Sequence, residues 1–422
     1  MKRRVSFFIA LRYLLGRAQE GGRYLRGAAA GIAVSLVPII VTLIVADGMI
    51  RGILDRYLEL GTGHLQIFSI SGPGGFEDIA EKVRETQGVR GAWLERRGIG
   101  VLVGAGGRSG ASIRAVQPSF WQDSGSREYL ELESGSMDIS GEREMLLGAS
   151  LAASIGVQTG DTVRLMTLDP GSGGLSVPRV TPFTVSGIVS SGYHELDAMW
   201  CVITEEGGRN ILGGEFGAAS MIVKIDDPYK GTQETLWNLY SSVGAGFILK
   251  TWRELLSSQY SSYEQTRQML LFIMALIVIV ATVNVSSATS MLVIERRRDI
   301  AVLKVTGAKP GGVTDIFLWG SFLTGVCGAV MGIALGLLIG VNINPLIHSL
   351  EAALSFFSGL FFGGSEVRIL DPDFYLAAIP VTIDWGTVFL IGCFTVLCSV
   401  LASWLPARHA GMLKPMELLR KY

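Results

Sequence analysis

The sequence predicts an α-helical membrane protein with four transmembrane helices and a large α+β domain inserted between the first and second helices. The chain is 49% hydrophobic and 17% charged, which is too apolar and too poor in charge for an ordinary soluble enzyme. Four runs without Asp, Glu, Lys or Arg are long enough to cross the roughly 30 Å hydrocarbon layer of a bilayer. They are residues 27–46, 268–294, 316–350 and 385–407, and a segment of mixed composition, 50–265, separates the first two.

The charged residues give the four helices one consistent orientation. Residues 1–26, 295–310 and the tail after 407 are rich in Lys and Arg, whereas 342–384 is mainly acidic. Because Lys and Arg concentrate on the cytoplasmic side of a membrane, both termini and 295–310 are expected in the cytoplasm, with 50–265 on the other side. The basic region before the first run is too long for a cleaved signal peptide, so the first helix is expected to remain in the protein.

These two observations predict an order of segments along the chain. It is a cytoplasmic amphipathic segment (1–26), transmembrane helix 1 (27–49), the α+β domain (50–265), helix 2 (266–294), a cytoplasmic helical segment (295–310), helix 3 (313–341), a loop on the far side (342–384), helix 4 (385–405) and a cytoplasmic tail (406–422). Within the loop, the uncharged stretch 352–365 is too short to span a membrane and is expected to form an interfacial helix.

The α+β domain is predicted from short alternating runs between Gly, Ser and Pro turns. The expected strands are 64–70, 100–105, 161–168, 181–189, 198–203 and 220–225, and the expected helices are 77–86 and 228–243. A β-rich lobe is expected at about 143–205, with a long connection, 168–182, inside it. Connections of that length are uncommon unless they are disordered or functional. Spacing alone favours an exposed hairpin tip over a partner-binding finger whose apolar tip would be Leu175, Val177 and Pro178.

No residue pattern predicts catalysis, a metal site or nucleic-acid binding. The histidines are scattered, and Cys201 is the only cysteine outside the predicted spans, so the domain can form no disulfide within itself. The stretch 104–112 (GAGGRSGAS) lacks the Lys-Ser/Thr ending of a phosphate loop and is expected to be a turn. The carboxylates of 193–197 are expected to cap a strand end rather than form an acid/base pair. A net charge of −1 and the absence of aromatic clusters among basic residues argue against nucleic acid.

Residues 293–310 (VIERRRDIAVLKVTGAKP) place a charged segment between two apolar runs. Residues 295–306 are expected to form a short helix, because Gly307 suits the position after a helix and Pro310 prevents its continuation. The residues expected on its apolar stripe are Ile294, Ala301, Val302 and Val305. A stop-transfer loop explains the arginines alone, whereas an apolar face with interleaved acids fits a helix that docks into a cleft of a cytoplasmic partner.

Three segments carry a resemblance to a known family. MLVIERRRDIAVLKVTGAKP (291–310) resembles the coupling-helix motif of ABC-transporter permeases of the FtsX/MacB/LolC superfamily. LPARHAGMLKPMELLRKY (405–422) resembles their C-terminal ending, and 31–60 resembles their first span and the helix that follows it. MacB-type exporters carry an ATPase domain that this chain lacks, and FtsX-type chains have a smaller external domain. Residues 148–166 and 252–294 are most similar to LolC/LolE-type lipoprotein-releasing permeases.

The resemblance implies a permease subunit in the bacterial inner membrane, with the α+β domain in the periplasm. It would extract acylated lipoproteins from the membrane and pass them to a periplasmic LolA-like carrier. It implies a second permease chain, as a homodimer or heterodimer, contact with membrane lipids, and a separate LolD-like ABC ATPase that binds ATP and Mg. The chain itself would carry no cofactor. The alternatives are a MacB/FtsX-like mechanotransmission permease for export or for regulating a periplasmic partner, and a membrane anchor unrelated to ABC transport.

The resemblance also implies three sets of site residues. Those expected to couple to the ATPase are Glu295, Arg296, Arg297, Asp299, Leu303 and Lys304. The carrier-docking residues would be Leu175, Val177 and Pro178 in the hook-like loop 168–182. Those expected to face the lipid cavity are Ile39, Leu43, Leu271, Met274 and Val278, for which ordinary helix packing is the alternative interpretation.

Overall fold

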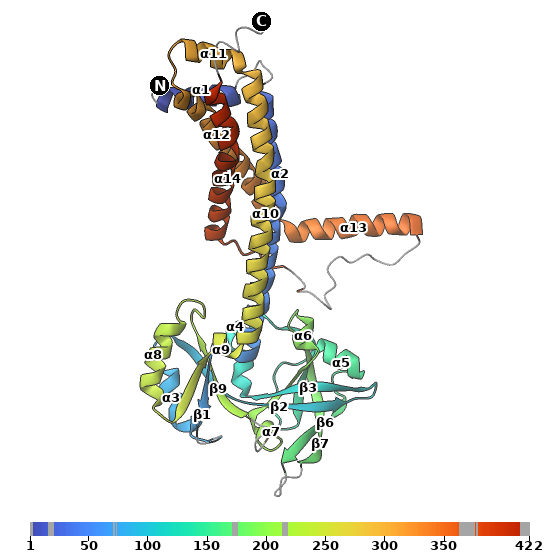
Figure 1. The fold of residues 1–422 in the computed structure, drawn as a ribbon. Coiled ribbons are helices and arrows are strands. Elements are labelled where there is room, and N and C mark those ends of the chain that lie inside the picture. The colour runs from blue at the N-terminus through green and yellow to red at the C-terminus, as the bar shows by residue number, and fades with distance from the viewer. Residues whose placement is uncertain are drawn as a thin grey trace. The chain divides into compact units, whose positions relative to one another are not determined.

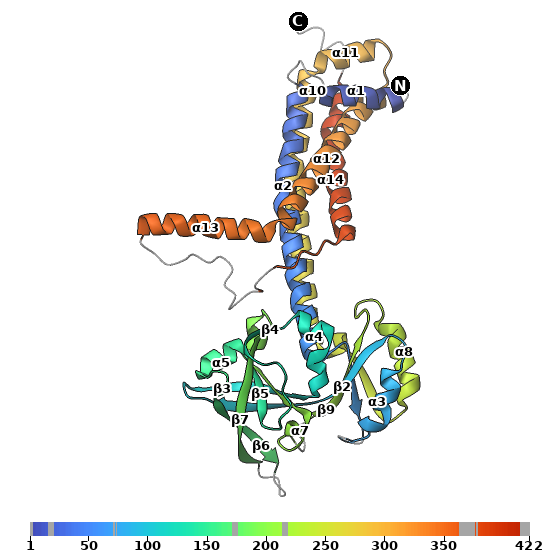
Figure 2. The same ribbon diagram turned by 180° about the vertical axis from the view of Figure 1, so that it is seen from behind.

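The chain forms two compact units in the computed structural model (Figures 1 and 2). The described residues are 3–15, 21–70, 72, 74–170, 176–212, 218–362, 376 and 379–413. The helical unit comprises Met1–Met49, Tyr263–Glu366 and Ile379–Tyr422, and the α+β unit comprises Ile50–Ser262 and Val367–Ala378. Each unit is described by itself below.

Four helices in the described part of the chain are long and apolar enough to cross a membrane. They are α2 (Gly21–Arg56), α10 (Ser257–Glu295), α12 (Pro310–Val341) and α14 (Trp385–Met412). All of them extend beyond the predicted spans at one end or both, because hydropathy marks the part that suits lipid and not where the backbone stops being helical. The expected tail 406–422 thus begins inside α14, which continues through Pro406 to Met412.

Close packing of α12 against α2 is built on a glycine repeat. Gly328, Gly332, Gly336 and Gly340 recur at every fourth position and lie against Ile32, Leu36, Ile40 and Ile44 of α2. Small residues at this spacing let two helix backbones approach closely in a membrane, where there is no hydrophobic drive for helices to associate. A hydroxyl cluster adds polar contacts between three helices, since the Thr289 Oγ1 of α10 lies 3.1 Å from Ser321 Oγ of α12 and 3.2 Å from Ser403 Oγ of α14.

The described part of the helical unit also contains three shorter helices, α1 (Arg3–Leu15), α11 (Arg297–Val305) and α13 (Ile343–Phe362). α1 packs on α12 through an edge-to-face contact of Phe7 with Trp319, 5.2 Å between ring centroids. In α1, Ser6 is buried, whereas Val5 and Phe8 are exposed.

One ten-stranded sheet organises the α+β unit. Its strands are β1 (Leu65–Ser69), β2 (Val89–Val103), β3 (Arg108–Val116), β4 (Glu131–Gly135), β5 (Glu144–Gly148), β6 (Thr162–Pro170), β7 (Ser176–Ser190), β8 (Trp200–Thr204), β9 (Ala218–Ile225) and β10 (Phe247–Thr251). The order is β10-β1-β9-β2-β3-β8-β5-β7-β4, and β6 pairs with β2 and β7. Pairs β3–β8 and β5–β7 are parallel, and the other pairs are antiparallel.

Short helices connect and cover these strands. They are the π-helical turn η1 (Tyr57–Thr62), α3 (Phe76–Arg84), the 3-10 turn η2 (Pro118–Gln122), α4 (Ser124–Glu128), α5 (Ala149–Ile155), α6 (His194–Asp197), α7 (Glu205–Arg209), α8 (Thr232–Val243) and α9 (Trp252–Leu255). α3 and α8 share an apolar core with β1, β9 and β10 through Ile79, Leu239 and Ile67. A second core, around Leu147 and Phe183, includes Leu102 of β2 and Ile113 of β3. The expected β-rich lobe 143–205 therefore shares its core and its ladder with strands outside that range.

The segment 168–182, which the sequence predicts as an unusually long connection, is largely a β-hairpin. β6 and β7 stay paired out to Pro170 opposite Ser176, and the residues between these two lie outside the described part of the chain. At Pro178 and Pro182, β7 pairs with β6 alone, because its ladders with β5 and β4 lie nearer its C-terminal end. Proline is tolerated at such a strand edge, so the prolines mark an edge, and the paired strands extend further into 168–182 than the sequence predicts.

Candidate functional site

The first candidate site is α11, which the structure isolates between two long helices. The chain breaks at Arg296 after α10 and turns again at Gly307, whose φ of 95° lies in the left-handed region expected of the residue after a helix. Pro310 then occupies the first turn of α12, where its missing N–H leaves no hydrogen bond unmade. These breaks separate a nine-residue helix from α10 and α12, although its Ile300 shares an apolar cluster with Leu292 of α10 and Val313 of α12.

One side of α11 is fastened to the N-terminal helix α1. The Arg296 guanidinium donates to Asp299 over 3.3 Å and lies 5.2 Å from the centroid of the Tyr13 ring. Burial and the Asp299 carboxylate raise the pKa of Tyr13 to about 12, so its hydroxyl stays protonated. Ile300 and Ala301 are buried. Arg296 and Asp299, predicted as coupling residues, therefore contact this chain's own α1.

Lys304, another predicted coupling residue, also bonds within the chain. Its ammonium donates to the carbonyls of Gly411 and Leu413, over 2.7 and 2.6 Å. A cation at this position neutralises the negative end of the α14 helix dipole and satisfies carbonyls that have no helical partner. Leu303 beside it is half-buried, and so is Glu295 at the end of α10. α11 is thereby tied to the end of α14.

The surface that α11 leaves open combines two arginines and two valines. Arg297 and Arg298 are exposed, and Val302 and Val305 are 55% and 67% exposed. Arg298, Val302 and Val305 recur at spacings of four and three and share one face of the helix. Of this surface, the predicted site set contains only Arg297. The sequence places Val302 and Val305 on an apolar stripe together with Ala301, and the structure leaves the two valines exposed while it buries Ala301.

The residues predicted to face a lipid cavity lie in the core of the helical unit. Ile39, Leu43, Met274 and Val278 are at most 5% exposed, and Leu271 packs against them. In this chain they hold α2 and α10 together, as in ordinary helix packing. The uncovered side of α10 is a different stripe, formed by Met269, Phe272, Leu276, Val280 and Val283.

The hairpin β6–β7 contributes to an apolar surface on the α+β unit. Of the predicted docking residues, Leu175 lies outside the described residues. Val177 of β7 pairs with Asp169 of β6, and Pro178 is exposed opposite Leu168. Cross-strand pairing places apolar residues of three neighbouring strands on one face. We call this the hairpin face, and its residues are Ile99, Val101, Met166, Leu168, Pro178 and Val180. Ile99 is 81% exposed and Leu168 is 53% exposed.

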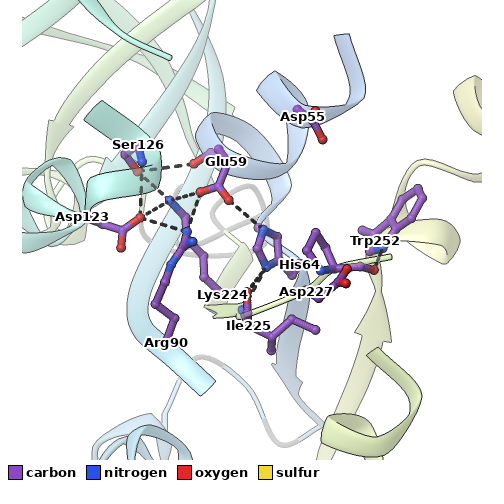
Figure 3. A network of polar contacts seen from close by, with 12 residues as sticks. Asp55, Glu59, His64, Arg90, Asp123, Ser126, Lys224, Ile225, Asp227 and Trp252 are labelled. Atoms are coloured by element: carbon purple, nitrogen blue, oxygen red, sulfur yellow. Dashed lines mark hydrogen bonds and ion pairs between the residues drawn. The ribbon is translucent and has the colours of Figure 1, made fainter. Parts of the chain in front are cut away.

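A buried ionic cluster, which no sequence signal predicted, joins η1 to the sheet (Figure 3). We call it the η1 anchor, formed by Glu59, His64, Arg90, Asp123, Ser126 and Lys224. The fully buried Lys224 ammonium lies 3.0 Å from Glu59, 2.8 Å from Asp123 and 2.6 Å from Ser126 Oγ. Arg90 pairs with the same two carboxylates, over 2.7 and 3.2 Å. The cluster therefore contains two acids held between two cations.

Aromatic rings and a histidine complete the surroundings of Lys224 and Glu59. The Lys224 ammonium lies 4.5 Å from the centroid of the Phe120 ring. His64 accepts from the Ile225 N–H at Nδ1 over 2.9 Å, which leaves Nε2 to donate to Glu59 over 3.1 Å. Burial lowers the pKa of Lys224, while Glu59 and Asp123 act in the opposite direction. The carboxylates thus offset part of the cost of burying this ammonium.

Two more cations meet the carboxyl end of η1. Arg114, 2% exposed, donates to the Leu60 carbonyl, and Arg97 donates to the Gly61 carbonyl over 2.8 Å. Glu95 pairs with both arginines. Because the carbonyl end of a helix carries partial negative charge, these arginines stabilise the end of the α2–η1 helix. Among the described residues, no group of three or more His, Cys, Asp or Glu is placed to hold a metal ion.

Comparisons with known proteins match both parts of the chain. Residues 271–415 match the family described as FtsX-like permease C-terminal, and residues 27–228 match the MacB-like periplasmic core domain. The chain is 27% identical over 420 residues to the lipoprotein-releasing system transmembrane protein LolC of Neisseria meningitidis serogroup B, covering 98% of each. It is 22% identical to the corresponding LolE protein of Haemophilus influenzae, covering 99% of each.

A solved structure also resembles part of the chain. The periplasmic region of MacB from Actinobacillus actinomycetemcomitans aligns with a TM-score of 0.30 and 18% sequence identity. The alignment covers 49% of this chain and 97% of that one.

Proposed function

Because this chain is a LolC/LolE-type permease of the FtsX/MacB superfamily, we propose that it extracts lipoproteins from the bacterial inner membrane as a subunit of an ABC transporter. The extracted lipoprotein would pass to a periplasmic LolA-like carrier. A separate LolD-like ATPase would bind ATP and Mg²⁺ and supply the energy. The observation that carries the proposal is similarity over the whole chain to proteins named for lipoprotein release, together with an exposed helix, α11, set between two long apolar helices.

The proposed topology has four spans, formed by α2, α10, α12 and α14. The α+β unit is inserted between the first two and lies in the periplasm, and both termini and α11 lie in the cytoplasm. The basic residues of 1–26 and 295–310 support this orientation. The energetic need for ATP follows from the cargo, since each buried CH₂ of an acyl chain contributes about 0.8 kcal/mol to membrane anchoring.

α11 is proposed to seat in the ATPase, with Arg297, Arg298, Val302 and Val305 as the contacting surface. The apolar pair would enter a cleft, and the two arginines would meet acidic residues at its edge. Movement of α11 would reach α14 through the Lys304 bonds to Gly411 and Leu413. It would reach α1 through Arg296 and Tyr13. The internal contacts of Arg296, Asp299 and Lys304 support a role for these three residues in transmission, whereas Arg297 belongs to the contacting surface.

Replacing Val302 and Val305 together with aspartate is expected to reduce the ATPase that co-purifies with the tagged full-length chain about tenfold or more, because the two charges would enter an apolar contact. The measurement is quantitative immunoblotting or mass spectrometry of the complex purified from membranes. Val5→Asp is the matched control, since Val5 is 46% exposed on α1. Equal retention by the double variant, or equal loss by the control, would contradict docking through α11.

The hairpin face is proposed as the surface that receives the lipoprotein carrier. Its exposed Leu168 and Val180 project from two paired strands, so they present apolar area on a rigid support. Replacing both with aspartate is expected to lower lipoprotein transfer to a LolA-like carrier at least tenfold while ATP hydrolysis continues. Ile248→Asp is the control, because Ile248 is 46% exposed on the separate strand β10. Unchanged transfer in the double variant would rule out this surface.

A second permease chain, or lipid, is proposed to cover the α10 stripe of Met269, Phe272, Leu276, Val280 and Val283.

The alternative function is force transmission to a periplasmic partner without lipid extraction. The two functions differ in whether the substrate must carry acyl chains. Release that requires the acyl chains of a lipoprotein supports extraction. Equal handling of acylated and unacylated forms supports mechanotransmission.

A further inference from the structure

Helix α13 (Ile343–Phe362) lies outside the packed helices of the helical unit. Both views show it running across the direction of α2 and α10 and away from them (Figures 1 and 2). The uncharged stretch 352–365 predicts a shorter interfacial helix that begins after Glu351. In the structure the helix begins earlier, at Ile343, and includes Glu351. Its role is not accounted for by ATPase coupling or by carrier docking.

The two sides of α13 differ in chemistry. The polar residues Asn344, His348, Glu351, Ser355 and Ser358 recur at spacings of four, three, four and three, which places them along one side of a helix. Leu346, Leu350 and Leu354 recur at every fourth position on another side and are 44%, 52% and 40% exposed. We call these three leucines the α13 leucine stripe. A helix with this separation is built to lie at a boundary between polar and apolar surroundings.

The start of α13 is fixed at the level where two membrane helices end. α12 stops at Val341, and Asn342 donates to the Leu338 carbonyl over 2.8 Å. Asn344 then bonds both backbone groups of Ile379, donating to its carbonyl over 2.9 Å and accepting from its N–H over 3.2 Å. Ile379 shortly precedes α14, which begins at Trp385. α13 therefore starts where α12 ends and close to where α14 begins, which in the proposed topology is the level at which both spans meet the bilayer surface.

We propose that α13 lies on the lipid surface of the outer leaflet, with the α13 leucine stripe in the acyl region. The start of α13 is fixed at the ends of α12 and α14, so the helix lies next to the bilayer surface. This position favours lipid over a soluble protein as the partner of the α13 leucine stripe. The only ionisable side chains of α13 are His348 and Glu351, which pair over 3.4 Å. Without Lys or Arg, the helix has no cation to attract anionic headgroups, so its insertion rests on apolar burial and is independent of salt.

The test compares two positions that are adjacent along α13 but lie on opposite sides. Leu350 and His348 are two residues apart, about 200° around the helix. Each is replaced by cysteine in the full-length chain, with Cys327, Cys393 and Cys398 changed to alanine and the fully buried Cys201 kept. A nitroxide label is attached, and collision rates with oxygen and with a water-soluble nickel chelate are measured in vesicles of phosphatidylethanolamine and phosphatidylglycerol.

The expected result is opposite accessibility at the two positions. The Leu350→Cys label should collide mainly with oxygen and the His348→Cys label mainly with the nickel chelate, and neither ratio should change with salt or with more phosphatidylglycerol. Equal access of nickel to both labels would place α13 in water. Protection of the Leu350→Cys label from both reagents would mean that protein covers the stripe. Either outcome, or a ratio that depends on salt, overturns the proposal.

Discussion

Replacing Lys224 with methionine is expected to lower the free energy of unfolding of the α+β unit by about 3–5 kcal/mol, because one member of a buried ionic cluster is removed. Methionine retains much of the side-chain length, so little volume is lost. What changes is the charge balance, since Glu59 and Asp123 would share only Arg90. Arg90 is partly exposed, with 29% of its side chain accessible, and cannot replace a fully buried ammonium.

Two further variants separate charge from packing. Arg209→Met removes a pair with Glu205 in which the arginine is 56% exposed, and the expected cost is about 0.3–0.5 kcal/mol. Adding Glu59→Gln and Asp123→Asn to Lys224→Met makes all three positions uncharged, and stability is expected to recover in large part. The measurement is chemical unfolding of the detergent-purified full chain, followed by tryptophan fluorescence, to which Trp93 and Trp121 contribute from the core of this unit.

Each of the two comparisons has its own outcome that would contradict the prediction. A Lys224→Met cost no larger than that of Arg209→Met would mean that the η1 anchor contributes little to stability. No recovery in the triple variant would mean that lost hydrogen bonds, and not uncompensated charge, cause the destabilisation.

The η1 anchor also explains a limit of sequence-based prediction. Lys224 meets Asp123 across 101 positions in the sequence, and nothing local to either residue indicates the pair. The sequence does not distinguish a buried lysine in a strand from an exposed one, because its burial depends on the order of strands in the sheet. Here β9, which carries Lys224, lies between β1 and β2. The membrane helices were accessible to prediction because lipid requires long uncharged runs whatever the tertiary contacts are.

The candidate site around α11 also has a part that local sequence signals predict and a part that depends on distant contacts. The segment containing α11 could be predicted, because Gly307 and Pro310 are local signals that end one helix and begin another. The roles of its charged residues could not, because Lys304 bonds carbonyls more than a hundred positions away. The connection within the hairpin was predicted too long because Pro178 and Pro182 are usually signs of a loop, and only the pairing of β7 shows that they lie at a strand edge.

Replacing Gly332 with alanine is expected to destabilise the helical unit by about 1–3 kcal/mol, through overpacking between α12 and α2. A Cβ at Gly332 would lie 2.7 Å from the Leu36 Cβ and 2.9 Å from the Ala33 carbonyl oxygen. Neither atom is the end of a flexible side chain, so the two helices would have to move apart. That movement would loosen the neighbouring contacts of Gly328 and Gly336, and a Gly332→Ala, Gly336→Ala double variant should cost more than either change alone.

Gly320 of the same helix provides the matched control. A Cβ there would meet only the Leu25 Cδ1, at 3.9 Å, which is ordinary contact. Gly320→Ala is therefore expected to be neutral or stabilising, since alanine favours a helix over glycine by about 1 kcal/mol. Thermal unfolding of the detergent-purified full chain gives the comparison. Similar midpoints for Gly332→Ala and Gly320→Ala would mean that α2 and α12 tolerate separation, and that the glycine repeat does not set their packing distance.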